Sequence, residues 1–79
     1  MRALPDPDDD AWLSELYRAI GERVRAERIR QGLTQDDVWQ AADVDRRTVQ
    51  NVESGRSMTV ASLARIARVL GVPLADLVR

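Results

Sequence analysis

The side chains that could do chemistry in this 79-residue sequence are carboxylates, arginines, amides and hydroxyls, because histidine and cysteine are both absent. Their absence excludes disulfides, Ser-His-Asp and Cys-His nucleophiles, the usual zinc sites and the commonest general base. We therefore expect no catalytic residue, no metal site and no cofactor, and we predict that the protein is not an enzyme.

The carboxylates form two clusters whose chemistry needs an explanation. Asp36 and Asp37 are adjacent, and four more acids lie in the first ten residues: Asp6, Asp8, Asp9 and Asp10. The second cluster lacks the glycine and the closing glutamate of a calcium loop. Acids in the first turn of a helix are stabilised by its dipole, so we interpret both clusters as helix-start residues.

The basic residues are twelve arginines, with no lysine. The planar guanidinium fork suits phosphates and the guanine edge, although heavy arginine use is also typical of GC-rich genomes. The overall net charge is −1. Because acids dominate the first ten residues and arginines slightly outnumber acids in the remainder, net charge neither supports nor excludes binding to nucleic acid.

The elements that position these side chains are predicted to be five helices and no strand. In the first, apolar residues recur at helical spacing from Leu13 to Val24. Gly21 interrupts this pattern, so one long helix and two abutting helices are both compatible with it, and Gly32 ends it. No stretch approaches the roughly 18 apolar residues of a membrane span, and the acidic start differs from a signal peptide.

The other four helices are short and have local start and stop signals. Thr34 and Asp37 resemble a capping box for a helix to about Ala42. Asp45 is a suitable N-cap for residues 46–53, which Ser54 and Gly55 close. Three further signals delimit the last two helices: Thr59 as an N-cap, Gly71 as a stop, and Pro73 at the first position of a final helix.

Several motifs resemble the Cro/Xre-type family of phage and bacterial repressors, without a gap from about Ile20 to Val78. The matching residues are Arg28, Gly32-Leu33-Thr34-Gln35, Val52-Glu53-Ser54-Gly55-Arg56 and Leu70-Gly71-Val72-Pro73. The resemblance implies an all-α, compact five-helix, lambda-repressor-like DNA-binding domain, here with an acidic N-terminal helical extension. We assign the helix-turn-helix domain to residues 11–79 and expect residues 1–10 to form an acidic, flexible arm. The helix-turn-helix motif would span about 34–54, with a reading helix at about 46–53.

The resemblance also assigns roles to individual residues. It implies that base edges are read by Arg46, Arg47, Gln50 and Asn51, a set suited to guanine and adenine. It implies phosphate contacts from Gln35, Thr48, Ser54 and Arg56, with backbone amides of residues 54–56 also facing phosphates. For Thr48, contact with a thymine methyl group is the alternative. An ion pair between Arg28 and Glu53 would tie the first helix to the reading helix.

Two residues depart from the family pattern. Asp43 stands where glycine is usual, because the turn there has a positive φ, which Asp tolerates better than most residues. Trp39 stands where alanine is usual, between two helices that approach closely. The indole either packs into a rearranged core beside Val49 and Val52 or turns outward as a partner-facing anchor.

The function expected from these features is sequence-specific binding of double-stranded DNA by a cytoplasmic transcriptional regulator, most simply a repressor. One module contacts too few base pairs for useful specificity, so we expect a homodimer. Two surfaces are candidates for its interface: the last helix (Leu74, Leu77, Val78) and the first helix (Trp12, Leu13, Leu16, Tyr17). The alternative is a helix-turn-helix module for protein–protein interaction, through Trp39 or the acidic segment, or an antitoxin-type autoregulator.

Overall fold

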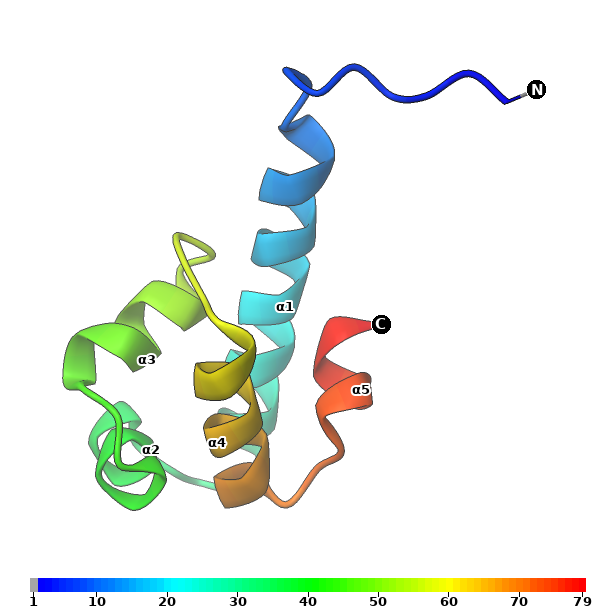
Figure 1. The fold of residues 1–79 in the computed structure, drawn as a ribbon. Coiled ribbons are helices and arrows are strands. Elements are labelled where there is room, and N and C mark those ends of the chain that lie inside the picture. Colours follow the sequence, from blue (N-terminus) through cyan, green and yellow to red (C-terminus); the bar gives the residue numbers. More distant parts are fainter. Residues whose placement is uncertain (1) are drawn as a thin grey trace.

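The computed structural model describes residues 2–79, which fold into five α-helices without a strand in that range (Figure 1). Met1, the first residue of the predicted arm, lies outside the described residues. The helices are α1 (Ala11–Arg30), α2 (Gln35–Ala42), α3 (Arg46–Glu53), α4 (Val60–Leu70) and α5 (Leu74–Val78). The predicted all-α architecture is confirmed.

Helix α1 is one continuous helix of 20 residues, which decides between the two alternatives that Gly21 left open. It ends at Gln31, and Gly32 follows with a φ of 72°, in the left-handed region that glycine adopts without strain. The first turns of α1 and the arm project beyond the body of the molecule (Figure 1). No helix in residues 2–79 combines the length and the apolar character that crossing a bilayer requires.

The start of α2 is the predicted capping box. The Asp37 amide donates to Thr34 Oγ1 at 3.0 Å, and the Thr34 amide donates to Asp37 Oδ2 at 2.8 Å. This bond from the Thr34 backbone amide holds the pKa of the Asp37 carboxyl below its usual value. Asp43 ends α2 with a φ of 56°, as expected for the residue at this turn.

The remaining helix ends follow the sequence signals with two differences. Thr59 caps α4, since its hydroxyl oxygen accepts from the Ser62 amide at 3.0 Å. Asp45 occupies the N-cap of α3 without a side-chain bond to the backbone. Pro73 is the N-cap of α5 and not its first helical residue, because its ψ of 141° is extended and the helix begins at Leu74.

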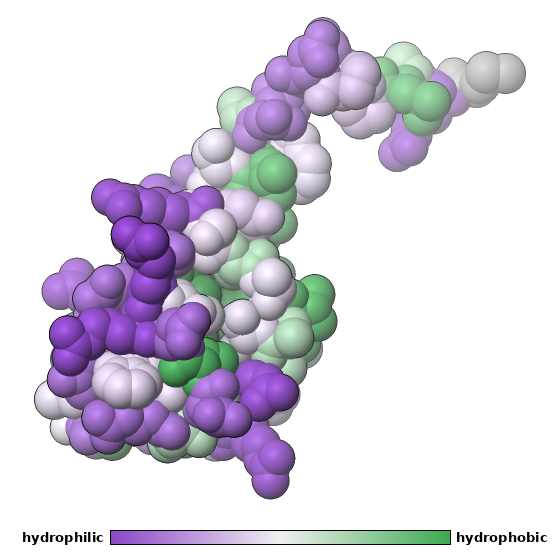
Figure 2. Space-filling model, turned by 60° about the vertical axis from the view of Figure 1, so that its left-hand side comes forward, coloured by the Kyte–Doolittle hydropathy of each residue, from purple (hydrophilic) through white to green (hydrophobic). Residues whose placement is uncertain are grey.

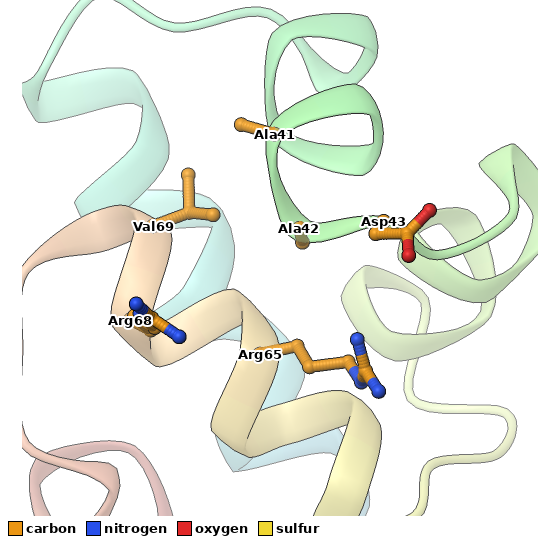
Figure 3. A pocket seen from close by; sticks show the side chains of 6 residues that line it. All are labelled: Ala41, Ala42, Asp43, Arg65, Arg68 and Val69. Carbon is orange, nitrogen blue, oxygen red and sulfur yellow. The ribbon is translucent and has the colours of Figure 1, made fainter.

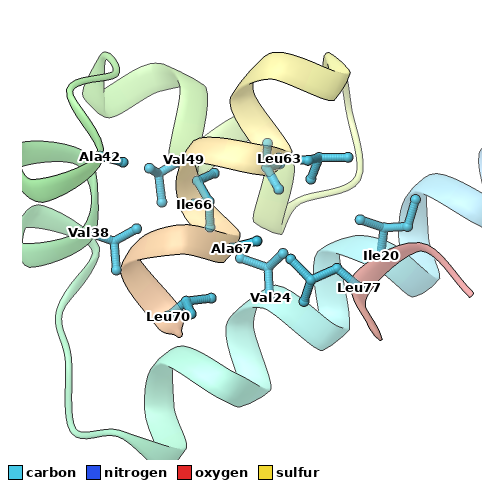
Figure 4. Packing of buried hydrophobic residues seen from close by; sticks show 11 residues of the cluster. Ile20, Val24, Val38, Ala42, Val49, Leu63, Ile66, Ala67, Leu70 and Leu77 are labelled. Carbon is cyan, nitrogen blue, oxygen red and sulfur yellow. The ribbon is translucent and has the colours of Figure 1, made fainter. Parts of the chain in front are cut away.

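The hydrophobic core receives side chains from all five helices (Figure 4). Val24, Val49 and Val52 have no exposed surface, so the two α3 valines face inward. The other buried apolar residues are Ile20, Val38, Ala42, Leu63, Ile66, Ala67, Leu70 and Leu77. Burial of Leu77 removes it from the candidate interface residues on the last helix.

The aspartates of the arm accept hydrogen bonds from backbone amides nearby in the sequence, but they do not cap α1 in the predicted way. Asp10 is the N-cap of α1 and makes no side-chain cap bond. Instead Asp9 Oδ1 accepts from the Ala11 amide at 3.2 Å, and Asp6 Oδ1 accepts from the Asp8 amide at 2.9 Å. These short-range turns lead the chain into α1.

Candidate nucleic-acid interface

Helix α3 presents a polar face to solvent opposite its two buried valines. Arg46, Arg47 and Gln50 are exposed, and Asn51 is half-buried. The side chains of Arg47, Gln50 and Asn51 form no hydrogen bond with any residue in 2–79. Figure 2 brings this side of the molecule forward and shows a largely hydrophilic surface. The face therefore carries polar groups that are available to a ligand.

A largely buried ion pair joins α1 to the end of α3. Arg28 Nε donates to Glu53 Oε2 at 2.7 Å and Arg28 Nη2 donates to Glu53 Oε1 at 2.9 Å. The side chains are only 12% and 4% exposed. The hydrogen bonds that Arg28 donates to Glu53 raise the pKa of Arg28 above its usual value. This bidentate geometry fixes the orientation of both groups.

Two further bonds extend this pair into a network that reaches α2. Arg28 Nη1 donates to the Leu33 carbonyl at 2.9 Å, and Gln35 Nε2 donates to Glu53 Oε1 at 3.2 Å. In the described residues, every buried side-chain nitrogen or oxygen has a partner. The network thus connects the end of α1, the start of α2 and the end of α3, and one N–H of the Gln35 amide remains for another acceptor.

Glycine residues allow α1 to lie directly against the end of α3, which the sequence did not predict. A Cβ on Gly21 would meet the Val52 carbonyl oxygen at 2.4 Å and the Glu53 carbonyl oxygen at 2.9 Å. Gly55 has a φ of 71°, and a Cβ there would meet the Arg18 Cα at 3.1 Å. Backbone packs on backbone at this crossing, so the position of α3 depends on these glycines.

The loop after α3 differs from what the resemblance implied. The amides of Ser54, Gly55 and Arg56 donate to the carbonyls of Gln50, Val52 and Asn51, respectively. The Ser54 hydroxyl also donates to the Asn51 carbonyl at 3.2 Å. These groups complete the end of the helix and are not directed at a ligand. The exposed Arg56 side chain, which forms no hydrogen bond within residues 2–79, is the donor that this loop offers to solvent.

Trp39 is neither packed fully into the core nor turned fully outward toward a partner. It is half-buried and packs against the edge of the core, while its indole Nε1 donates to Asp36 Oδ1 at 2.9 Å. Asp36 Oδ2 in turn accepts from Arg46 Nη2 at 3.3 Å, and the Arg46 guanidinium carbon lies 6.0 Å from the centroid of the Trp39 ring. The indole is thus partly buried against the core, and its N–H belongs to a surface cluster with Asp36 and Arg46.

An apolar groove of about 310 Å³ lies between α1, the start of α4 and α5. Its lining includes Leu16 and Tyr17 from α1, and Leu74 and Val78 from α5. The two candidate interface surfaces of the sequence are therefore parts of one groove. Val60 also lines it and is 73% exposed.

A hollow of about 450 Å³ lies between α2 and α4 (Figure 3). It is lined by Ala41, Ala42 and Asp43 at the end of α2 and by Arg65, Arg68 and Val69 of α4. None of the residues predicted to contact DNA lines this hollow. Among the described residues, no group of three or more acidic side chains is arranged to hold a metal ion.

The fold and the polar α3 face define a helix-turn-helix protein, and comparison with known proteins identifies the family. A helix-turn-helix family model matches residues 24–77, about two thirds of the chain. The chain belongs to this family, which confirms the Cro/Xre-type resemblance, and it is a DNA-binding transcriptional regulator. The match begins within α1, so the arm and the first turns of α1 lie outside it. No curated protein matches the sequence.

Three solved structures share the fold. The restriction-modification controller protein C.AhdI from Aeromonas hydrophila is 26% identical, with a TM-score of 0.73 over 77% of this chain and 94% of its own. The clp gene regulator ClgR from Corynebacterium glutamicum is 28% identical, with a TM-score of 0.73 over 78% of this chain and 67% of its own. The hypothetical transcription factor NHTF from Neisseria, at 24% identity, has a TM-score of 0.77 over 100% of this chain and 85% of its own.

Proposed function

We propose that this regulator is a repressor that binds operator DNA as a homodimer, with α3 of each copy in the major groove. The observation that carries this proposal is the outward face of α3, where Arg47, Gln50 and Asn51 have no partner within residues 2–79. Its opposite face is anchored by buried valines and by the Arg28–Glu53 pair. A short helix with one fixed face and one unpartnered polar face suits insertion into a groove.

The proposed base contacts follow from hydrogen-bonding chemistry. Arg46 and Arg47 would each offer two parallel N–H groups to guanine O6 and N7, while Gln50 and Asn51 would pair with adenine N6 and N7. Repression would follow from occupancy of the operator, which denies that stretch of DNA to other proteins. The similar solved structures come from bacteria, whose operator DNA lies in the cytoplasm, and this supports a cytoplasmic location.

The proposed phosphate contacts flank this face. Gln35 is the first residue of α2, Thr48 lies within α3, and Ser54 and Arg56 follow α3. Arg56 is the strongest of these candidates because its charged side chain is exposed and neutralises one phosphate on binding. Ser54 is the weakest, since its hydroxyl proton is already given to the Asn51 carbonyl.

Two arginine substitutions separate base reading from phosphate binding. We expect Arg47→Ala to lower affinity for the selected duplex by about 1–3 kcal/mol and to relax selection at one base pair. We expect Arg56→Ala to weaken binding to all duplexes alike and to reduce the salt dependence by about one unit of slope. Selection from random duplexes, followed by gel shifts at two salt concentrations, measures both effects.

The control is Arg25→Ala, which removes an exposed arginine from α1. Arg25 lines a shallow surface hollow formed by α1 residues alone. It should leave base selection unchanged, and circular dichroism should show the same helical content in all variants. If Arg47→Ala and the α3 variants Arg46→Ala, Gln50→Ala and Asn51→Ala all select the parental sequence, α3 is not the reading element.

A homodimer is supported by the apolar groove between α1, α4 and α5. Apolar residues that remain exposed beside it include Trp12, Val60 and Val78, at 62%, 73% and 38%. Trp12 lies four residues before Leu16 and so on the same side of α1. A second copy seated here would cover this surface, and a dimer that reads two half-sites needs its two reading helices about 34 Å apart.

We expect Val60→Ser to raise the dissociation constant of the dimer at least about tenfold, because each of the two copies would lose an apolar side chain from the interface. Analytical ultracentrifugation over a concentration series measures the dissociation constant. Ile29→Ser is the matched control, since Ile29 is 54% exposed on α1 but does not line the groove. Equal effects of the two substitutions, or none from Val60→Ser, would rule out this groove as the interface.

A further inference from the structure

The side chain of Arg46 is held by two residues of the neighbouring helix. Its Nη2 donates to Asp36 Oδ2 at 3.3 Å, and its guanidinium carbon lies 6.0 Å from the centre of the Trp39 ring. This distance is at the limit of a cation–π contact. Arg47, the next residue on the same helix, has no comparable partner within residues 2–79.

The two supporting residues are bonded to each other, and one of them packs against the core. Trp39 is half-buried against the core, and its Nε1 donates to Asp36 Oδ1 at 2.9 Å. One carboxylate oxygen is therefore bound by the indole and the other by Arg46. The chain of contacts leads from the core through Trp39 and Asp36 to the guanidinium. An arginine held in this way has fewer rotamers to lose on binding than a free one.

We propose that Asp36 and Trp39 are positioning residues that fix Arg46 for recognition of a single guanine. This inference rests on the proposed function, in which α3 enters the major groove. Arginine has five N–H donors, and the pair with Asp36 uses a proton of Nη2 only. The other Nη2 proton and the Nη1 group can still form the parallel pair of bonds that guanine O6 and N7 accept.

The Asp36 carboxylate has a second and opposite effect on DNA binding. Its side chain is 55% exposed beside the reading helix, where it repels phosphates. The carboxylate therefore lowers affinity for any duplex while it raises discrimination at the base pair that Arg46 reads. Such opposite effects distinguish a positioning residue from one that only stabilises the fold, since loss of folding would weaken all binding together.

The test measures binding of the variants to the selected duplex, to duplexes changed at one base pair at a time, and to a random duplex. We expect Asp36→Asn to bind the random duplex more tightly. We also expect the ratio of its affinities for the selected duplex and for a duplex changed at one base pair to fall about three- to tenfold at that position. Trp39→Phe keeps an aromatic ring, although a smaller one, and removes the Nε1 donor, so we expect a smaller loss at the same base pair. In the Arg46→Ala background, Asp36→Asn should change discrimination no further.

Asp45→Asn is the matched control. Asp45 precedes Arg46, is exposed and makes no side-chain cap bond, so this substitution removes the same charge from the same surface without touching the guanidinium. It should increase affinity for all duplexes and leave discrimination unchanged. If Asp36→Asn behaves like Asp45→Asn, or if it lowers discrimination equally in the Arg46→Ala background, the positioning role is wrong.

The design separates failure of this inference from failure of the proposed function. If Arg46→Ala leaves selection unchanged while Arg47→Ala relaxes it, α3 still reads DNA and only the role of Asp36 and Trp39 is refuted. If none of the α3 substitutions alters selection, the proposed reading function fails, and this inference fails with it.

Discussion

Replacing Glu53 by Gln is expected to lower the free energy of unfolding by about 3–5 kcal/mol, because it leaves the charge of Arg28 largely buried without its partner. The two side chains are 4% and 12% exposed. The neutral amide has one oxygen in place of two. Its NH₂ group must therefore face an N–H of Arg28, which already donates to both carboxylate oxygens.

Chemical denaturation of the parent and the variant measures this loss, with Glu22→Gln as a control. Glu22 pairs with Arg18 on the surface, where the side chains are 67% and 53% exposed, and such pairs contribute about 0–1 kcal/mol. Arg28→Lys should also destabilise the fold, since lysine keeps the charge but cannot bind Glu53 with a fork. A loss of less than about 0.5 kcal/mol for Glu53→Gln would make this pair equivalent to a surface pair.

Gly21→Ala is expected to destabilise the protein by about 1–3 kcal/mol or more, as in other overpacked sites. Helix propensity alone predicts the opposite sign, a gain of about 1 kcal/mol for this substitution inside a helix. The new Cβ would lie 2.4 Å from the Val52 carbonyl oxygen and 2.9 Å from the Glu53 carbonyl oxygen. Both are backbone atoms at the end of α3, so α1 and α3 would have to separate.

The control for this prediction is Ala26→Gly, an exposed position in the same helix. It should lose about 1 kcal/mol and so measure helix propensity in α1 itself. Thermal denaturation compares the three proteins. A Gly21→Ala variant that is more stable than the parent would contradict the direct packing of α1 on α3.

Both predictions concern how α3 is held. Helices shorter than about 12–15 residues are marginal on their own in water, and α3 has 8 residues. Its orientation must therefore come from Val49 and Val52 in the core and from α1 at its carboxyl end. A reading helix that depends on these contacts should lose base selection together with stability when they are broken.

Much of the fold could be predicted because its signals are local. The reciprocal bonds of Thr34 and Asp37, the Thr59 cap and the positive φ of Asp43 and Gly71 each involve neighbouring residues. The inward orientation of Val49 and Val52 follows from helical spacing, which depends on the chain alone. The sequence therefore determined the five helices and the face of α3 that points away from the core.

Contacts between residues far apart in the sequence could not be predicted in this way. Helix spacing does not indicate that Gly21 meets the carbonyls of α3, or that α1 and α5 line a common groove. The composition gives no sign that Trp39 and Asp36 hold Arg46. Such contacts depend on how the helices cross, because packing geometry, not the local preference of each residue, determines which atoms meet. The sequence alone determined which elements form and which residues face outward. The tertiary structure decided how α3 is held and which of its arginines lies against side chains of α2.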